Sequence, residues 1–120
     1  MAHSIVLDTN AENCAILQSI ELLGGRYKLL ILRALLSTDR PLRFGELRRF
    51  ADGVSQKTLT RNLRELEADG ILTRTVFAEV PPRVEYALTD AGRALMPVFM
   101  ALHGWREANP SVGERRGAAR

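Results

Sequence analysis

Hydrophobic residues in the first part of the chain predict two helices separated by a pair of glycines. In the first helix the apolar residues recur at helical spacing, and they are Ile16, Leu17, Ile20 and Leu23. We expect Asn13 to cap this helix at its start and Gly24-Gly25 to end it. The next run, over residues 27–36, is apolar on most sides of a helix, so we expect this helix to be almost enclosed at the centre of the core.

The middle of the chain predicts a helix-turn-helix unit. A short helix is indicated by apolar residues at every third position, which are Phe44, Leu47 and Phe50. Asp52 and Gly53 then supply a turn. A longer helix is expected over about residues 55–69, between a capping Ser55 and a terminating Gly70. Its apolar stripe consists of Leu59, Leu63 and Leu66. Two helices joined in this way form the unit with which many proteins bind DNA.

Alternating residues predict a β-hairpin after this unit. Residues 72–80 and 84–88 alternate and are rich in Thr, Val, Phe and Tyr. Pro81 and Pro82 between them prevent regular pairing at the tip and make the loop rigid. A hairpin directly after a DNA-binding helix is a wing. The predicted fold class is therefore mainly α (α+β), a winged helix-turn-helix with flanking N- and C-terminal dimerisation helices.

The last predicted helix covers about residues 90–106, after a capping Thr89-Asp90. Pro97 lies inside it and should kink it or mark a break. Its apolar stripe is broader than a small domain needs. We therefore expect a dimer interface formed with the first helix, by Ile16, Ile20, Leu95, Phe99, Leu102 and Trp105. The alternative is that the stripe packs inside its own domain.

Basic side chains are concentrated in the helix-turn-helix unit. The formal net charge is only +3, whereas residues 40–64 hold seven cations and two anions. On the longer helix Lys57, Arg61 and Arg64 project opposite the leucine stripe, with Gln56 and Thr60 on one flank. Such a face suits the major groove of DNA, and the alternative is an ordinary solvated face.

Cations outside the longer helix extend this basic region. They are Arg43, Arg48 and Arg49 near the shorter helix and Arg74 and Arg83 on the wing. Arg74 and Arg83 would reach the DNA backbone or the minor groove. For Arg48 and Arg49, contact with phosphates and simple solubilisation of the helix are equally good interpretations.

Length and composition limit the classes of function. The 120 residues, 46% of them hydrophobic, fit one domain, which we place at residues 13–106 between a flexible segment (1–12) and a disordered tail (107–120). The single cysteine forms no internal disulfide, and no segment has the pattern of a membrane span or a secretory signal, so we expect a cytoplasmic protein with no membrane partner. The chain shows no metal-ligand spacing and no catalytic constellation, so we expect neither a cofactor nor an enzyme.

Several segments follow one another in an order and spacing typical of a known family. They are Gly24-Gly25 before a helix ending LLILRALL, then RFGELRRF, GVSQKTLTRNLRELEADGIL and PPRVEYALTDAGRAL. Over about residues 14–105 the chain resembles the HxlR-type transcriptional regulators, winged-helix proteins related in architecture to the MarR group. The resemblance implies that the start of the DNA-binding helix is formed by Ser55, Gln56, Lys57, Thr60 and Arg61. It also implies that the wing tip is formed by Pro81, Pro82 and Arg83.

The resemblance also draws attention to Cys14, because some members of the family carry a thiol here that senses electrophiles or oxidants. A thiol near a helix N-terminus can be reactive. The alternative is that Cys14 is a small packed residue. This chain has Ala15 after the cysteine, where members of the family usually have proline.

The sequence thus predicts a DNA-binding transcriptional regulator. It would bind a pseudo-palindromic operator as a homodimer and respond to a redox, electrophile or small-molecule signal. Its partners would be double-stranded DNA, a second copy of itself and an effector of unknown identity. The alternative is a winged-helix module that binds another protein without operator recognition. The clustered cations favour DNA, because a protein-binding face would tend to be neutral or acidic.

Overall fold

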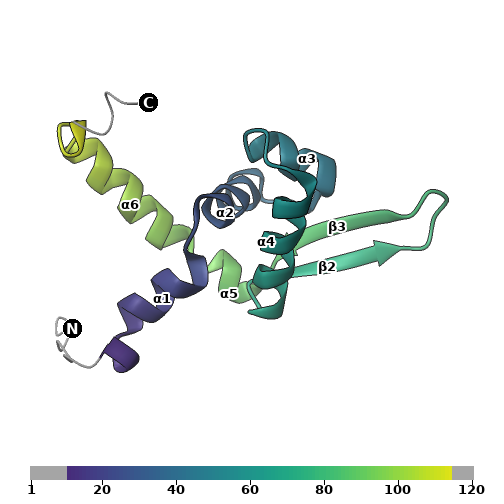
Figure 1. Ribbon diagram of the computed structural model, residues 1–120, viewed down its shortest axis with the longest axis horizontal. Coiled ribbons are helices and arrows are strands. Elements are labelled where there is room, and N and C mark those ends of the chain that lie inside the picture. Colours follow the sequence, from purple (N-terminus) through teal and green to yellow (C-terminus); the bar gives the residue numbers. More distant parts are fainter. Residues whose placement is uncertain (1–10, 115–120) are drawn as a thin grey trace.

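The computed structural model describes residues 11–114, and its elements are arranged as a winged helix-turn-helix (Figure 1). The helices are η1 (Ala11–Asn13), α1 (Ala15–Leu23), α2 (Arg26–Thr38), α3 (Phe44–Phe50), α4 (Gln56–Ala68), α5 (Asp90–Arg93) and α6 (Met96–Ala108). The strands are β1 (Leu42–Arg43), β2 (Leu72–Phe77) and β3 (Arg83–Leu88), which form an antiparallel sheet in the order β1-β3-β2. This architecture confirms the predicted winged helix-turn-helix with a helix at each end. The wing extends from one side of the molecule, and α1 and α6 diverge from the other.

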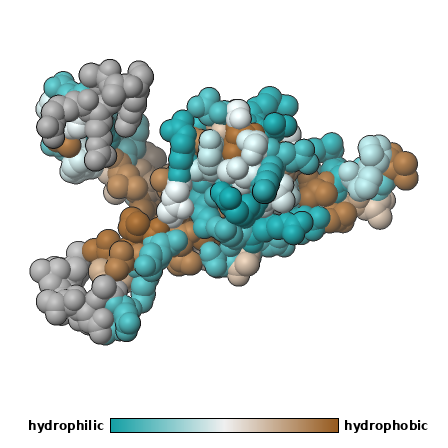
Figure 2. All heavy atoms as spheres, in the orientation of Figure 1, coloured by the Kyte–Doolittle hydropathy of each residue, from teal (hydrophilic) through white to brown (hydrophobic). Residues whose placement is uncertain are grey.

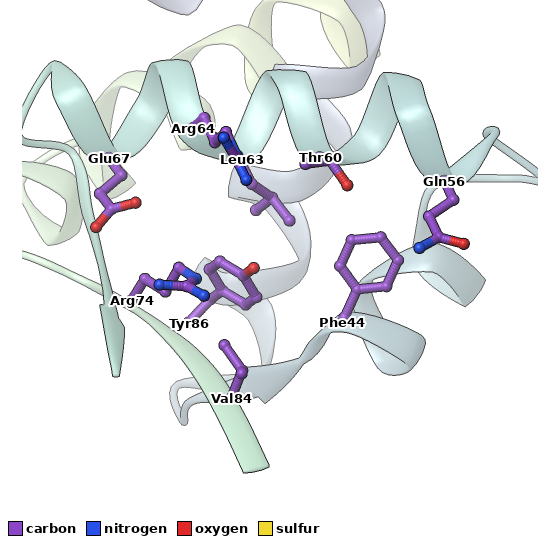
Figure 3. A pocket seen from close by; sticks show the side chains of 9 residues that line it. All are labelled: Phe44, Gln56, Thr60, Leu63, Arg64, Glu67, Arg74, Val84 and Tyr86. Atoms are coloured by element: carbon purple, nitrogen blue, oxygen red, sulfur yellow. The ribbon is translucent and has the colours of Figure 1, made fainter. Parts of the chain in front are cut away.

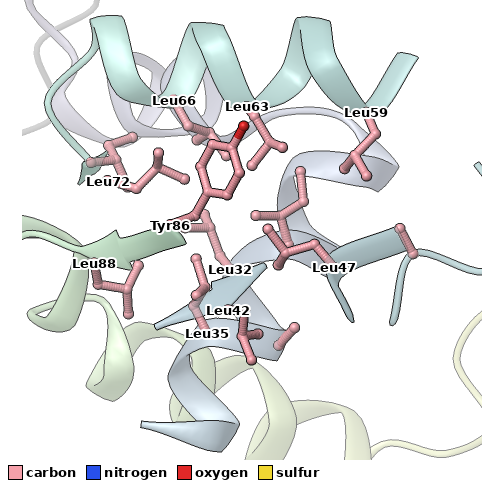
Figure 4. Packing of buried hydrophobic residues seen from close by; sticks show 14 of the residues in the cluster. Leu32, Leu35, Leu42, Leu47, Leu59, Leu63, Leu66, Leu72, Tyr86 and Leu88 are labelled. Carbon is pink, nitrogen blue, oxygen red and sulfur yellow. The ribbon is translucent and has the colours of Figure 1, made fainter. Parts of the chain in front are cut away.

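The core lies between α2, α4 and the sheet, where leucines of α4 point toward Tyr86 and the side chains of α2 (Figure 4). Its largest fully buried side chains are Ile31, Leu32, Leu35, Leu42, Leu47, Leu59, Leu63, Leu66 and Leu72. The expectation that α2 is almost enclosed is wrong, because Leu29 is 41% exposed. The face of α2 that carries Leu29 is turned toward α6, away from the core, and only the opposite face is buried.

The first helix begins at a different cap from the one predicted. Cys14 is the N-cap of α1, and its Sγ accepts a hydrogen bond from the backbone N–H of Leu17 at 3.5 Å. Asn13 belongs to the preceding 3-10 turn, so its backbone is not available for the extended conformation of a cap. The predicted end at Gly24-Gly25 is confirmed, and Gly25 has a φ of 107°, which favours glycine.

The helix-turn-helix unit follows its prediction closely. Ser55 caps α4, since its Oγ accepts from the backbone N–H of Thr58 at 3.1 Å. Asp52 and Gly53 form the turn with φ values of 57° and 77°. The turn is tied to its surroundings by Arg48, whose Nε donates to the Val54 carbonyl at 3.0 Å, and by an ion pair between Arg26 and Asp52. The Arg48 bond joins α3 to the segment that leads into α4, whereas the ion pair is exposed to solvent.

The C-terminal segment contains two helices instead of one. Of the two alternatives for Pro97, a break is confirmed, because α5 ends at Arg93 and Pro97 lies in the first turn of α6. Proline is favoured there because a first-turn N–H has no partner within the helix. Thr89 caps α5 through Gly92 and also donates to the Gly70 and Ile71 carbonyls. Gly92 lies so close to the backbone just before β2 that an added Cβ would be 2.4 Å from the Ile71 carbonyl oxygen.

The ends of the described chain carry most of the exposed apolar side chains. Figure 2 shows them as brown surface on the two diverging helices, with a further patch at the tip of the wing. Helix α6 reaches Ala108, and residues 109–114 form turns held by backbone hydrogen bonds. Most of the predicted flexible segment (1–12) and part of the predicted tail (107–120) lie outside the described residues. Within residues 11–114 no helix is long and apolar enough to cross a membrane.

Candidate nucleic-acid interface

Helix α4 presents a cationic face to solvent. Its leucines are buried on the opposite side, so Lys57, Arg61 and Arg64 are exposed as predicted. Among residues 11–114 these three cations have no ion pair or hydrogen-bond partner. No ion pair therefore neutralises their charges within the described residues. Gln56 is exposed on the same helix and Thr60 is half-buried.

A contact between α2 and α4, which the sequence analysis did not identify, fixes the position of this face. The Nζ of Lys28 lies 2.8 Å from the Glu65 carboxylate, and the Lys28 side chain is only 10% exposed. The hydrogen bond from Lys28, and then its charge, lower the pKa of Glu65. Asn62 is also buried and donates to the Thr58 carbonyl at 2.8 Å. The only sign of this contact in the sequence was Lys28, a single lysine within the leucine-rich run of α2.

A groove of about 280 Å³ lies between α4 and the wing (Figure 3). Its lining residues are Phe44, Gln56, Thr60, Leu63, Arg64, Glu67, Arg74, Val84 and Tyr86. Arg64 comes from the helix and Arg74 from β2, where it pairs with Tyr86. The structure thus brings two predicted cations to opposite walls of one groove, together with polar groups of Gln56 and Thr60. The two guanidiniums offer N–H donors of the kind that bind phosphate, and Glu67 places one carboxylate in the same groove.

The three arginines near α3 differ in their hydrogen-bond partners. The backbone N–H of Arg43 donates to Glu46 at 2.9 Å. The guanidinium of Arg43 is exposed and has no ion pair or hydrogen bond among the described residues. That hydrogen bond, followed by one from Arg40, lowers the pKa of Glu46. Arg48 uses its Nε to hold the turn, as described above. Arg49 has no such internal partner within residues 11–114 and is exposed. The structure therefore gives Arg48 a structural contact that Arg49 lacks.

At the wing tip, the surroundings of Arg83 differ from the prediction. Pro82 is exposed as expected, and Val80, two residues before it, is fully exposed. Arg83, however, forms ion pairs with Glu79 and Glu85 and stacks on the ring of Phe77. These neighbours follow from the antiparallel register, which pairs Phe77 with Arg83, and the predicted strand over residues 72–80 did not supply that register.

The residues expected at a dimer interface divide into two groups. Ile16, Ile20, Leu102 and Trp105 are all more than half exposed. Leu95 and Phe99 are half-buried and pack on the core, so they connect α6 to its own domain. Leu29 and Met100 add exposed apolar surface that the sequence analysis did not include. Cys14 is half-buried at the start of α1 and is not in a disulfide.

Comparison with known proteins agrees with this geometry. The family model for the HxlR-like helix-turn-helix matches residues 22–113. The HTH-type transcriptional regulator YybR of Bacillus subtilis is 41% identical over 105 residues, which cover 88% of this chain and 82% of YybR.

Solved structures of regulators have the same fold. The redox regulator HypR in its reduced form is 40% identical, with a TM-score of 0.75 over 83% of this chain and 97% of HypR. A MarR-family regulator from Porphyromonas gingivalis W83, described as putative, is 34% identical, with a TM-score of 0.74 over 82% and 94% of the two chains. These relatives are transcriptional regulators and not enzymes. On this combined evidence of sequence and fold, the chain is a helix-turn-helix transcriptional regulator and belongs to the HxlR-like family.

Proposed function

We propose that the protein binds double-stranded DNA at a pseudo-palindromic operator, as a homodimer, and thereby regulates transcription. The observation that carries this proposal is the exposed face of α4, where Lys57, Arg61 and Arg64 lack partners within the described residues. Three unpaired cations on one helix create a positive field that phosphates neutralise. A cytoplasmic location is part of the proposal, because the chromosome is found there.

The proposed contacts divide between bases and phosphates. Residues near the start of α4 enter the major groove, and these are Ser55, Gln56, Lys57, Thr60 and Arg61. The hydroxyl of Ser55 is already used to cap α4, so Gln56 and Arg61 are the stronger candidates for hydrogen bonds to base edges. Phosphate contacts are assigned to Arg43, Arg48, Arg49, Arg64 and Arg74, while Pro82 lies against the DNA at the wing tip.

Dimerisation is proposed through the exposed apolar side chains of α1 and α6. Ile16, Ile20, Leu102 and Trp105 would be removed from water in such a dimer, and each is now more than half exposed. A two-fold dimer presents two copies of α4 to successive major grooves, roughly 34 Å apart. One subunit alone could contact only half of the operator.

The Arg61→Ala substitution tests the base-contacting role of α4. We expect a loss of about 1–3 kcal/mol on a duplex selected by the wild-type protein from a random pool, with relaxed preference at one position of each half-site. Fluorescence anisotropy over a series of salt concentrations would measure both affinity and its salt dependence. Arg61→Lys is the matched control, because it retains the charge but loses the bidentate geometry.

The outcomes of this experiment are distinct. If Arg61→Ala weakens selected and random duplexes equally, Arg61 contacts the backbone and not a base. If the wild-type protein selects no sequence and binds DNA without the steep salt dependence of phosphate contacts, operator binding is refuted. The alternative function, a protein-binding module, would then be the better interpretation of the exposed face.

We propose that the protein responds to oxidants or electrophiles through Cys14. A small-molecule effector is also part of the proposal, without assigned binding residues. The thiol is free and partly accessible, and it caps the helix that would form the dimer interface. HypR, which is named as a redox regulator, has a similar fold and supports the proposal. Oxidation or alkylation would attach a further group to the sulfur and so disturb its hydrogen bond with the Leu17 N–H at the start of α1.

The Cys14→Ser substitution tests this signal with little structural change, because serine is itself a favoured N-cap. We expect the wild-type protein to change its DNA affinity after treatment with diamide or a quinone, and the Ser variant to keep its affinity. Anisotropy with the selected duplex, before and after treatment, is the measurement. An equal response of both proteins would assign Cys14 the role of an ordinary capping residue.

A further inference from the structure

The guanidinium of Arg83 is held on three sides by residues of its own hairpin. One Nη lies 3.2 Å from the Glu79 carboxylate, and the Nε lies 3.6 Å from that of Glu85. The guanidinium carbon is 4.0 Å from the centre of the Phe77 ring. The 3.6 Å separation is an ion pair but is too long for a hydrogen bond, and the buried Nε has no hydrogen-bond partner among residues 11–114. The side chain as a whole is 29% exposed.

The two cations of the wing occupy opposite faces of the hairpin. Neighbouring residues of a strand point to opposite faces, so Arg74 and Phe77 of β2 lie on different faces. Arg74 faces α4 and lines the groove with Arg64. Arg83 is the cross-strand partner of Phe77 and stacks on its ring, so it lies on the face away from α4.

The charge around Arg83 is unfavourable for phosphate. Glu79, Arg83 and Glu85 together carry a formal charge of −1, from two anions and one cation. A phosphate that approached Arg83 would also approach two carboxylates. The apex next to them, residues 80–82, is uncharged and exposed. Arg74, in contrast, has no ion pair within the described residues.

We infer that Arg83 is a positioning residue, which clamps the wing tip to Phe77, Glu79 and Glu85, and that Arg74 is the cation with which the wing binds phosphate. This assignment rests on the proposed DNA-binding function and makes it more specific. It means that the tip approaches DNA as a neutral, preformed apex, and that the salt-dependent contact of the wing is made in the groove beside α4.

The salt dependence of binding distinguishes the two roles, because each phosphate contact contributes about 0.9 to the slope of log affinity against log salt. The full-length protein would be titrated with the duplex selected by the wild type, across a series of salt concentrations. We expect Arg74→Gln to lower the slope by about 0.9 per subunit. We expect Arg83→Gln to leave the slope unchanged while weakening affinity about two- to fivefold, the size typical of an exposed ion pair.

A second set of variants tests the clamp itself. The double substitution Glu79→Gln with Glu85→Gln should release Arg83 to contact phosphate and raise the slope by about 0.9 per subunit. Adding Arg83→Gln to that protein should return the slope to the wild-type value. Circular dichroism and thermal unfolding would establish that each variant is folded.

Two results would overturn the assignment. One is a slope lowered by Arg83→Gln as much as by Arg74→Gln, since Arg83 would then be a phosphate ligand in the wild-type protein. The other is an unchanged slope in the Glu79 and Glu85 double variant, since the carboxylates would then not mask Arg83. A wild-type protein that fails to bind DNA would instead refute the proposed function, and the assignment with it.

Discussion

The Leu102→Glu substitution is expected to convert the dimer into monomers and to weaken binding to the selected duplex by about 10²- to 10⁴-fold. Leu102 is 59% exposed on α6, within the apolar surface that the dimer would bury. A carboxylate placed there without a partner would lose its hydration on association, which is costly. The two recognition helices would then bind independently and lose the advantage of being linked.

Light scattering after gel filtration would measure the mass, and anisotropy would measure the affinity. Leu102→Met is the matched control, because it preserves an apolar side chain of similar volume and should remain dimeric. Thermal unfolding of the Glu variant would show that the subunit itself is intact. A Leu102→Glu protein that remained a dimer with unchanged affinity would show that α6 is not the interface.

The Gly92→Ala substitution is expected to destabilise the protein by about 1–3 kcal/mol, the usual cost of overpacking. An added Cβ would lie 2.4 Å from the Ile71 carbonyl oxygen and 2.9 Å from a methyl of Leu88. The first contact is with backbone, so α5 must move away from Ile71 to relieve it. Urea unfolding followed by circular dichroism would measure the change.

Gly45→Ala provides the control for this experiment. Gly45 lies in α3, and an added Cβ would meet nothing within 4 Å. Alanine is favoured over glycine inside a helix by roughly 0.5–1 kcal/mol, so this variant should be slightly more stable than the wild type. If Gly92→Ala matched Gly45→Ala in stability, the close approach of Gly92 to the Ile71 backbone would not restrict the residue at position 92.

The helix-turn-helix unit could be predicted because its signals are local. The serine cap, the leucine stripe and the Asp-Gly turn all lie within a few residues of the structure that they determine. The cationic face of α4 follows directly from the leucine stripe, since side chains opposite a buried stripe must be exposed. The exposure of Lys57, Arg61 and Arg64 was therefore predictable, whereas their contacts with DNA remain predictions.

Features that depend on distant segments were not predictable to the same degree. The exposure of Leu29 depends on where α6 leaves the domain, which no pattern in α2 reveals. Pro97 allowed either a kink or a break, and its sequence neighbours alone do not distinguish the two. The surroundings of Arg83 required the exact hairpin register, and the expected strand over residues 72–80 ends at Phe77.

Helix α4 separates the residues that hold it in place from those proposed to contact bases. Its attachment uses Leu59, Leu63 and the Glu65–Lys28 ion pair, whereas Lys57 and Arg61 form no ion pair or hydrogen bond among the residues described. Mutations at exposed positions of this kind usually change stability by less than about 0.5 kcal/mol. After gene duplication, a copy of this protein could therefore acquire a new target sequence through a few substitutions on one helix face, without first acquiring compensating mutations elsewhere.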